Sequence, residues 1–338
     1  MRLQRSVPMG LVLFVLIGLT GCASNPQKGK VLHFPAELAS PYLSLVQIIS
    51  GDTAPTTGLL SKVSRLLFGS SASYRLDQPT DMTVDSQGRL LIVDSGTSII
   101  HRFIREDGIW QYERNFQISE LSHPIAIASG NEHLFISDLQ TGKVFILDED
   151  LKIKIQLKDS TFDRPGDLCY DGLNKRILIS DPAAGRVYIY TLQGEKLGEL
   201  GGALGGAGSL QSPVSVAVNA STGSIFVLDG LARKVKQFGS DLSYSSSFGQ
   251  YDQVPGSFAF PKDITQSTDG VLFVSDAAFG NIQMFDPSGA LLYFFGENGT
   301  DPGQFLMPRN LHLDADQYLY IADPYNNRVQ IFQYHAQP

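Results

Sequence analysis

A pattern of apolar and polar positions repeats six times along the chain between residues 79 and 332. Each copy begins with a proline, passes through an alternating segment and a turn, and ends a second, continuous apolar segment with an aspartate. The pairs are Pro79 and Asp94, Pro124 and Asp138, Pro165 and Asp181, Pro213 and Asp229, Pro261 and Asp276, and Pro308 and Asp323. The two residues of a pair lie 14 to 16 positions apart, and successive prolines lie 41 to 48 apart. Alternating segments and short apolar runs both indicate β-strands.

Each copy predicts four short strands, and the fifth copy illustrates them. Its expected strands begin at Asp263 and then cover Val271–Ser275, Asn281–Phe285 and Leu291–Phe295. Asp269-Gly270 between the first two is a tight-turn signal. Four strands in each repeat of this length are typical of β-propellers, and no helical periodicity follows residue 70. The sequence therefore predicts an all-β, six-bladed β-propeller.

The two ends of the repeat region predict how the ring closes. The last copy reaches only its third strand, Arg328–Phe332, before the chain stops at Pro338. The segment Tyr42–Ser50 precedes the first copy and has no first strand of its own. An open ring leaves two unpaired edge strands, so we expect this segment to supply the fourth strand of blade six. Apolar residues at helical spacing over 53–74 predict a short helix at one edge.

The text of the repeats resembles the NHL repeat over about residues 42–333. The last copy carries Phe295-Gly296, Gly303-Gln304-Phe305, Tyr318–Asp323 and Asn327–Phe332. The resemblance implies that the first strand of each blade lines a central channel. It also implies that the proline loops and the loops after the terminal aspartates share one face. Propellers have many functions, so the resemblance indicates a fold and not an activity.

The N-terminus has the features of an export signal. Arg2 and Arg5 precede an apolar segment, Met9–Leu19, which is too short to span a bilayer as a helix. Leu19-Thr20-Gly21-Cys22 resembles the lipobox of bacterial lipoproteins, which implies cleavage before Cys22 and acylation of its thiol; a plain secretory signal with an incidental cysteine is the alternative. Two or more acyl chains anchor a protein stably. The expected divisions are a signal peptide over 1–21, a tether over 22–38 and the propeller over 39–338.

The residue after Cys22 bears on localisation. Ala23 stands where, by resemblance to enterobacterial sorting, an aspartate retains a lipoprotein at the inner membrane. We therefore expect the periplasmic side of the outer membrane, or the outer face of the plasma membrane in a host without an outer membrane.

Charge and cysteine content exclude several classes of partner. The chain has 26 Lys and Arg against 34 Asp and Glu; residues 1–21 contain two arginines and no acid, so the remainder has 24 against 34. This balance argues against nucleic acid, which needs a basic surface. It also argues against binding of the membrane except through the lipid anchor.

Cys169 lies in an apolar run and is interpreted as a buried hydrophobic residue.

The position two residues after each proline provides candidate site residues. It holds Asp81, Ala126, Asp167, Ser215, Asp263 and Asn310. The three aspartates belong to blades one, three and five, so they are expected to alternate around the channel mouth. A divalent cation there would relieve their repulsion, although Ca²⁺ needs six to eight oxygen donors. The alternative is that each aspartate accepts backbone hydrogen bonds at the entry to its strand. The aspartates that end the second strands recur in every copy and are interpreted as structural, tying their loops to a neighbouring blade.

The loops around the prolines differ from copy to copy. They carry His123, Arg164, Arg309 and Asn310, together with Gln78, Phe260 and Lys262. The loops after the terminal aspartates add Leu139, Phe279 and Tyr325 on the same face. Such a mixed polar and aromatic rim suits a protein, peptide or glycan partner. An ordinary solvated loop face is the alternative.

No catalytic constellation stands out in the sequence. Among NHL propellers, peptidyl-amidating lyase is a zinc enzyme, but only His123 and His312 here lie in or beside first strands. A catalytic zinc site usually has three protein ligands. We therefore expect a non-catalytic binding or scaffold lipoprotein of the cell envelope, without a cofactor. The alternatives are a metal-dependent lyase or hydrolase at the channel mouth and a sensory module of a larger system.

Overall fold

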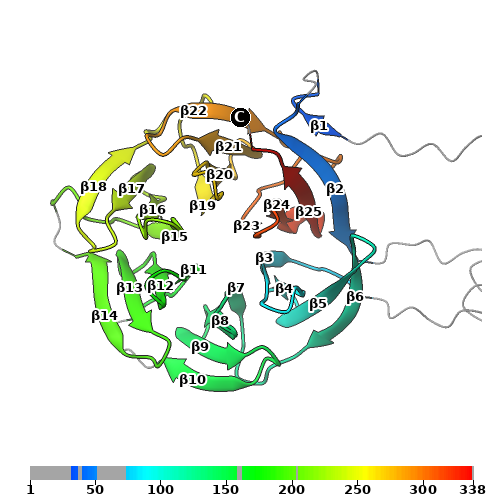
Figure 1. The fold of residues 1–338 in the computed structure, drawn as a ribbon, viewed down its shortest axis with the longest axis horizontal. Coiled ribbons are helices and arrows are strands. Elements are labelled where there is room, and N and C mark those ends of the chain that lie inside the picture. The colour runs from blue at the N-terminus through cyan, green and yellow to red at the C-terminus, as the bar shows by residue number, and fades with distance from the viewer. Residues whose placement is uncertain (1–31, 37–39, 52–73, 158–161, 203–204, 337–338) are drawn as a thin grey trace, which may run out of the picture. The chain divides into compact units, whose positions relative to one another are not determined.

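The computed structural model describes residues 32–36, 40–51, 74–157, 162–202 and 205–336. Their strands form six antiparallel sheets arranged in a ring (Figure 1). All of the described residues belong to one compact unit, residues 32–338. Cys22 and residues 53–73 of the expected helix lie outside the described residues. The prediction of an all-β, six-bladed propeller is confirmed.

Five blades have four strands each, taken consecutively from the chain. Blade one contains β3 (Pro79–Val84), β4 (Leu90–Asp94), β5 (Ile99–Glu106) and β6 (Ile109–Phe116). Blade two contains β7 (Pro124–Gly130), β8 (His133–Asp138), β9 (Lys143–Asp148) and β10 (Ile153–Leu157). Blade three contains β11 (Leu168–Asp171), β12 (Arg176–Asp181), β13 (Arg186–Thr191) and β14 (Lys196–Gly201). Blade four contains β15 (Pro213–Val218), β16 (Ile225–Asp229), β17 (Lys234–Phe238) and β18 (Tyr244–Phe248). Blade five contains β19 (Pro261–Gln266), β20 (Leu272–Asp276), β21 (Asn281–Phe285) and β22 (Leu291–Phe295).

Blade six is assembled from both ends of the described chain. Its strands are β23 (Leu311–Leu313), β24 (Tyr318–Asp323), β25 (Arg328–Tyr334), β2 (Leu43–Ser50) and β1 (His33–Phe34), and a 3₁₀ turn, η1 (Pro324–Asn326), follows β24. β2 pairs antiparallel with β25, with Leu43 opposite Tyr334 and Ile49 opposite Val329. The expected closing strand therefore forms where the sequence placed it. β1 adds a fifth strand from within the segment expected to be a tether.

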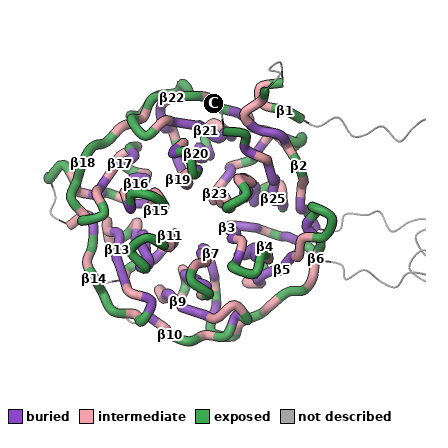
Figure 2. Tube along the Cα trace, in the orientation of Figure 1, coloured by how far each residue is buried: buried purple, intermediate pink, exposed green. Residues whose placement is uncertain are grey.

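Burial explains the apolar patterns of the strands. Every residue of the second strands β4, β12, β16 and β20 is buried, because these strands have a blade on each side. The fourth strands form the rim of the ring and alternate or are largely exposed, as Figure 2 shows along β14, β18 and β22. Six clusters of buried apolar side chains in the described chain each join two adjacent blades. The cluster between blades six and one includes Ile49 and Phe103, so the ring is closed by packing as well as by strand pairing.

The aspartates that end the second strands anchor the proline loops. All six are fully buried, at 0% exposure. Asp276, for example, accepts hydrogen bonds from the backbone nitrogens of Ala259 at 2.8 Å and Phe260 at 3.1 Å. Each such loop leads into the blade whose second strand carries the aspartate. The carboxylate therefore ties the loop to its own blade, and the expectation that it reaches a neighbouring blade is wrong.

Candidate functional site

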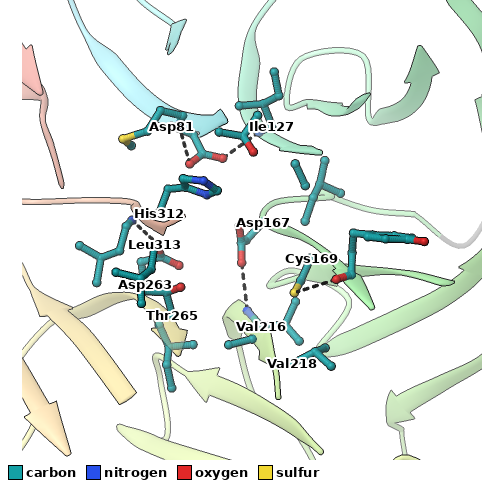
Figure 3. A pocket seen from close by; sticks show the side chains of 18 of the residues that line it. Asp81, Ile127, Asp167, Cys169, Val216, Val218, Asp263, Thr265, His312 and Leu313 are labelled. Carbon is teal, nitrogen blue, oxygen red and sulfur yellow. Dashed lines mark hydrogen bonds between the residues drawn. The ribbon is translucent and has the colours of Figure 1, made fainter. Parts of the chain in front are cut away.

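A cavity of about 230 Å³ lies along the inner strands of the ring. It is lined by residues of β3, β7, β11, β15, β19 and β23, the first strands of all six blades. Asp81, Asp167, Asp263 and His312 contribute polar groups to it, and Figure 3 shows them around one space. We call this cavity the channel.

The three channel aspartates connect neighbouring blades. Asp81 accepts a hydrogen bond from the backbone nitrogen of Ile127 at 2.7 Å, and Asp167 accepts one from Val216 at 3.0 Å (Figure 3). Asp263 accepts from the backbone nitrogen of Leu311. In every case the donor lies on the first strand of the next blade. The carboxylates of blades one, three and five are thus hydrogen-bonded to the first strands of blades two, four and six, respectively.

Burial changes the protonation of these carboxyls. It raises the pKa of Asp81 and Asp263 well above the usual range of an aspartate, and the charge of Asp167 raises both further. Burial raises the pKa of Asp167 to about 6. The group therefore carries less than three full negative charges near neutral pH, which limits the mutual repulsion expected from the sequence.

His312 also connects two blades. Its Nε2 accepts a hydrogen bond from the backbone nitrogen of Val84 at 3.2 Å, which joins blade six to blade one. Burial lowers the pKa of this imidazole to about 4, so the ring is neutral at pH 7. Since an accepting Nε2 has its lone pair occupied, His312 is not available through that atom as a metal ligand.

The chemistry open to the channel is correspondingly narrow. In the described ranges, no group of three or more His, Cys, Asp or Glu side chains is placed to hold a metal ion. The thiol of Cys169 also lines the channel, and burial together with the charge of Asp167 raises its pKa, which suppresses the reactive thiolate. The polar groups of the channel act mainly as connections between blades.

A second cavity, of about 330 Å³, lies among the proline loops. We call it the mouth. Five blades contribute its lining, which consists of Ile125, Ala126, Leu139, Arg164, Gly166, Asp167, Pro182, Val214, Lys262, Arg309 and Asn310. Asp167 lines both the mouth and the channel.

Three cationic side chains line the mouth. Arg164 is exposed, whereas Lys262 and Arg309 are half-buried. Burial lowers the pKa of Lys262 to about 8, and the charge of Arg309 lowers it further. The Lys262 Nζ lies 3.5 Å from the centroid of the Phe260 ring. Burial also lowers the pKa of Arg309.

The structure separates the seven residues predicted to bind. Asp81 and Asp263 line the channel, Arg164, Arg309 and Asn310 line the mouth, and Asp167 lines both. His123 lines neither cavity; its backbone nitrogen bonds Asp138.

Sequence reasoning emphasised the position two after each proline and, of the residues directly after a proline, singled out only Lys262 and Arg309. That position supplies five of the mouth residues, namely Ile125, Gly166, Val214, Lys262 and Arg309. In blade one the same position is Thr80, whose hydroxyl instead bonds Ser95 at 2.7 Å. The proline register alone could have identified this set, because it is fixed in all six copies.

Fold and cavities together define a six-bladed β-propeller with a channel of blade-connecting polar groups and a mouth of variable side chains. No family model matches the chain, and no curated protein matches it. The described part of the chain contains no helix that is both long enough and apolar enough to cross a bilayer.

Solved structures share the fold at low sequence identity. Selenomethionine-substituted virginiamycin B lyase from Staphylococcus aureus is 15% identical, with a TM-score of 0.56 over 80% of this chain and 86% of that one. A streptogramin B lyase is 13% identical, with a TM-score of 0.55 over 79% and 84% of the two chains. A catalytically inactive histidine-to-alanine variant of the Staphylococcus aureus lyase with quinupristin is 13% identical, with a TM-score of 0.55 over 77% and 96%. At these identities the similarity establishes the propeller fold.

Proposed function

We propose that this protein is an envelope-anchored, non-catalytic binding lipoprotein that takes its ligand in the mouth of the propeller. One observation carries the proposal. The mouth is lined by side chains that differ from blade to blade, whereas the polar groups of the channel are engaged in bonds between blades. Groups that recur from blade to blade maintain the fold. Binding residues are concentrated on variable loops that a rigid scaffold holds in place.

The dimensions of the mouth support binding of a small group. Its volume of about 330 Å³ is at the lower end of the range for ligand pockets. A terminal residue of a peptide, one sugar of a glycan or one side chain of a protein partner fits this size. The partner is therefore a protein, peptide or glycan of the envelope that inserts one such group.

Anchoring is proposed from the sequence. The arginines at positions 2 and 5, the short apolar segment and the box ending in Cys22 support acylation of that cysteine. Ala23 after the cysteine supports the periplasmic side of the outer membrane. An anchored propeller of this kind would hold its ligand or partner close to the membrane surface.

A metal-dependent lyase or hydrolase is the second candidate. The solved structures that share the fold include streptogramin B lyases, and they cover most of this chain. Fold similarity alone does not transfer an activity. Metal analysis of the purified protein and mass spectrometry of quinupristin incubated with it separate the two candidates. Stoichiometric metal together with a converted product would replace the binding proposal.

A variant that fills the mouth tests the binding proposal. Leu139→Trp introduces a bulky indole ring into the lining of the mouth. Leu173→Trp introduces the same ring at a position where the leucine is 53% exposed and lines neither cavity. Native mass spectrometry of the full chain purified from envelopes should find a co-purifying molecule with the unmodified protein and with Leu173→Trp, but not with Leu139→Trp. Retention of the same molecule by Leu139→Trp would contradict the proposal.

A further inference from the structure

The mouth concentrates positive charge in a protein that is acidic overall. The chain has a formal net charge of −8, yet Arg164, Lys262 and Arg309 line one cavity of about 330 Å³. They come from blades three, five and six, so the ring brings them together across 145 residues of sequence. Within the described ranges, none of their side chains has a hydrogen bond or an ion pair with a carboxylate.

This arrangement is costly without an anion. Like charges at close range repel, and burial removes part of the water that would screen them. The lowered pKa of Lys262 reflects both effects. Asp167 is the one acid in the lining, and its Oδ2 is bound to the backbone nitrogen of Val216 at 3.0 Å. The charges of Asp276 and Asp81 act favourably on Lys262 and Arg309 respectively, but the pKa of each cation is still lowered. The lining itself therefore carries more positive than negative charge.

Several other residues of the mouth are apolar. Ile125 and Leu139 come from blade two, Pro182 from blade three and Val214 from blade four. These side chains offer no donor or acceptor beyond their backbone. An occupant that satisfies the whole cavity therefore combines a negative group with a small apolar group.

We propose that the mouth binds an organic oxyanion, with a carboxylate or phosphate against Arg164, Lys262 and Arg309 and an apolar body against Ile125, Leu139 and Val214. The inference rests on the proposed use of the mouth as the binding site and names its ligand class. Guanidinium groups bind carboxylate and phosphate through paired hydrogen bonds. At about 30 Å³ for each water-sized atom, the cavity of about 330 Å³ holds about eleven non-hydrogen atoms.

Binding of small probes to the full-length protein in detergent tests the ligand class. The probes are phenylacetate, phenyl phosphate, the neutral phenylacetamide and inorganic phosphate, measured by isothermal titration calorimetry or ligand-observed NMR. We expect phenylacetate or phenyl phosphate to bind at least tenfold more tightly than phenylacetamide and than inorganic phosphate. Tighter binding of phenyl phosphate than of phenylacetate indicates a phosphate ligand, and the reverse order indicates a carboxylate. Equal binding of acid and amide, or no binding of either acid at 10 mM, would overturn the proposal.

Three matched variants locate the site. Arg164→Gln and Arg309→Gln should each weaken binding of the preferred acid at least tenfold. Arg114→Gln removes a guanidinium whose side chain is 61% exposed on the outer strand β6, and it should change nothing. Since Arg164 is exposed, its variant is expected to fold even if Arg309→Gln does not. Unchanged affinity in Arg164→Gln, or equal weakening in all three, would contradict the assignment.

Failure of this inference can be told apart from failure of the proposed function. If Leu139→Trp loses the co-purifying molecule while Arg164→Gln and Arg309→Gln keep it, the mouth binds a ligand that is not an anion. If the acids bind with the expected dependence on Arg309 while Leu139→Trp still keeps the co-purifying molecule, the anion site stands and the proposed function fails.

Discussion

At the scale of single residues, the channel aspartates were visible in the sequence but their partners were not. The register after each proline singled out Asp81, Asp167 and Asp263. Their backbone donors lie 46, 49 and 48 residues further on, about one repeat away. The alternative that they bond backbone amides is what the structure shows for all three. The donors are those of the next blade, with Met82 beside Asp81 as an additional one.

Replacing Asp167 with asparagine should change how stability depends on pH. The pKa of Asp167 is about 6 in the folded protein, against 3.8 for the free side chain. The folded state therefore binds this proton more tightly, so the contribution of Asp167 to stability falls as pH rises from 4 through 6. Asp167→Asn keeps an acceptor for Val216 and removes the charge. We expect it to raise the melting temperature at pH 8 relative to the unmodified protein, and to raise it less at pH 5.

The control for this measurement is Asp150→Asn, at an exposed aspartate in the turn after β9. Its effect on the melting temperature should be small and should not follow the profile of Asp167→Asn. A stabilisation by Asp167→Asn that is larger at pH 5 than at pH 8 would mean that the carboxyl is ionised favourably in the folded state.

Asp263 offers a test of the bonds between blades. Asp263→Ala leaves the backbone nitrogen of Leu311 and the hydroxyl of Ser215 without this acceptor. An unsatisfied buried polar group costs about 1–3 kcal/mol, so the free energy of unfolding should fall by at least that amount in urea denaturation. Asp263→Asn should cost less because its carbonyl still accepts one bond. Equal losses in the two variants would show that the charge, and not the acceptor, matters at this position.

At the scale of elements, the repeat pattern predicted the longer strands but neither the two-residue strand β1 nor its contacts. β2 was predicted because Tyr42–Ser50 precedes the first copy without a first strand of its own and the last blade lacked a fourth strand. β1 has only two residues, His33 and Phe34, too few for any periodicity. The Phe34 and Phe295 rings lie 5.4 Å apart, a contact between residues 261 positions apart that sequence spacing cannot indicate.

The closing strand makes a direct prediction for stability. Ile49 on β2 is 2% exposed and lies in the apolar cluster between blades six and one. Ile49→Ala should lower the free energy of unfolding by about 2–5 kcal/mol, the usual cost of truncating a buried aliphatic side chain. Val46→Ala, on the same strand at 47% exposure, is the control and should cost under 1 kcal/mol, since few packed atoms are removed there. A loss under 1 kcal/mol for Ile49→Ala would mean that β2 does not contribute to the closed ring.

At the scale of the whole molecule, the fold followed from sequence and the site followed only in part. Six copies in phase were enough to predict the ring and the strand that closes it. The mouth could not be delimited from one sequence, because it depends on which loops meet across five blades. Leu139, Pro182 and Val214 line it although they are ordinary apolar residues in the sequence.

Replacing the cysteine of the lipobox tests the anchor. Acyl chains contribute about 0.8 kcal/mol for each buried methylene, so their loss should release the protein from the membrane. Cys22→Ser should move the protein from the membrane fraction to the soluble fraction. Cys169→Ser, which alters the other cysteine of the chain, should leave fractionation unchanged. Membrane association that persists in Cys22→Ser would contradict the predicted acylation.

Hydrogen–deuterium exchange with and without the co-purified ligand tests the binding face most directly. Backbone amides of the ligand-free protein should exchange faster than those of the ligand-bound protein in the proline loops over 122–126, 162–167 and 306–311, which contribute residues to the mouth. Exchange in the turn over 172–175, between β11 and β12, should be the same in both states. Protection confined to that turn, or no difference at the three loops, would contradict a binding site at the mouth.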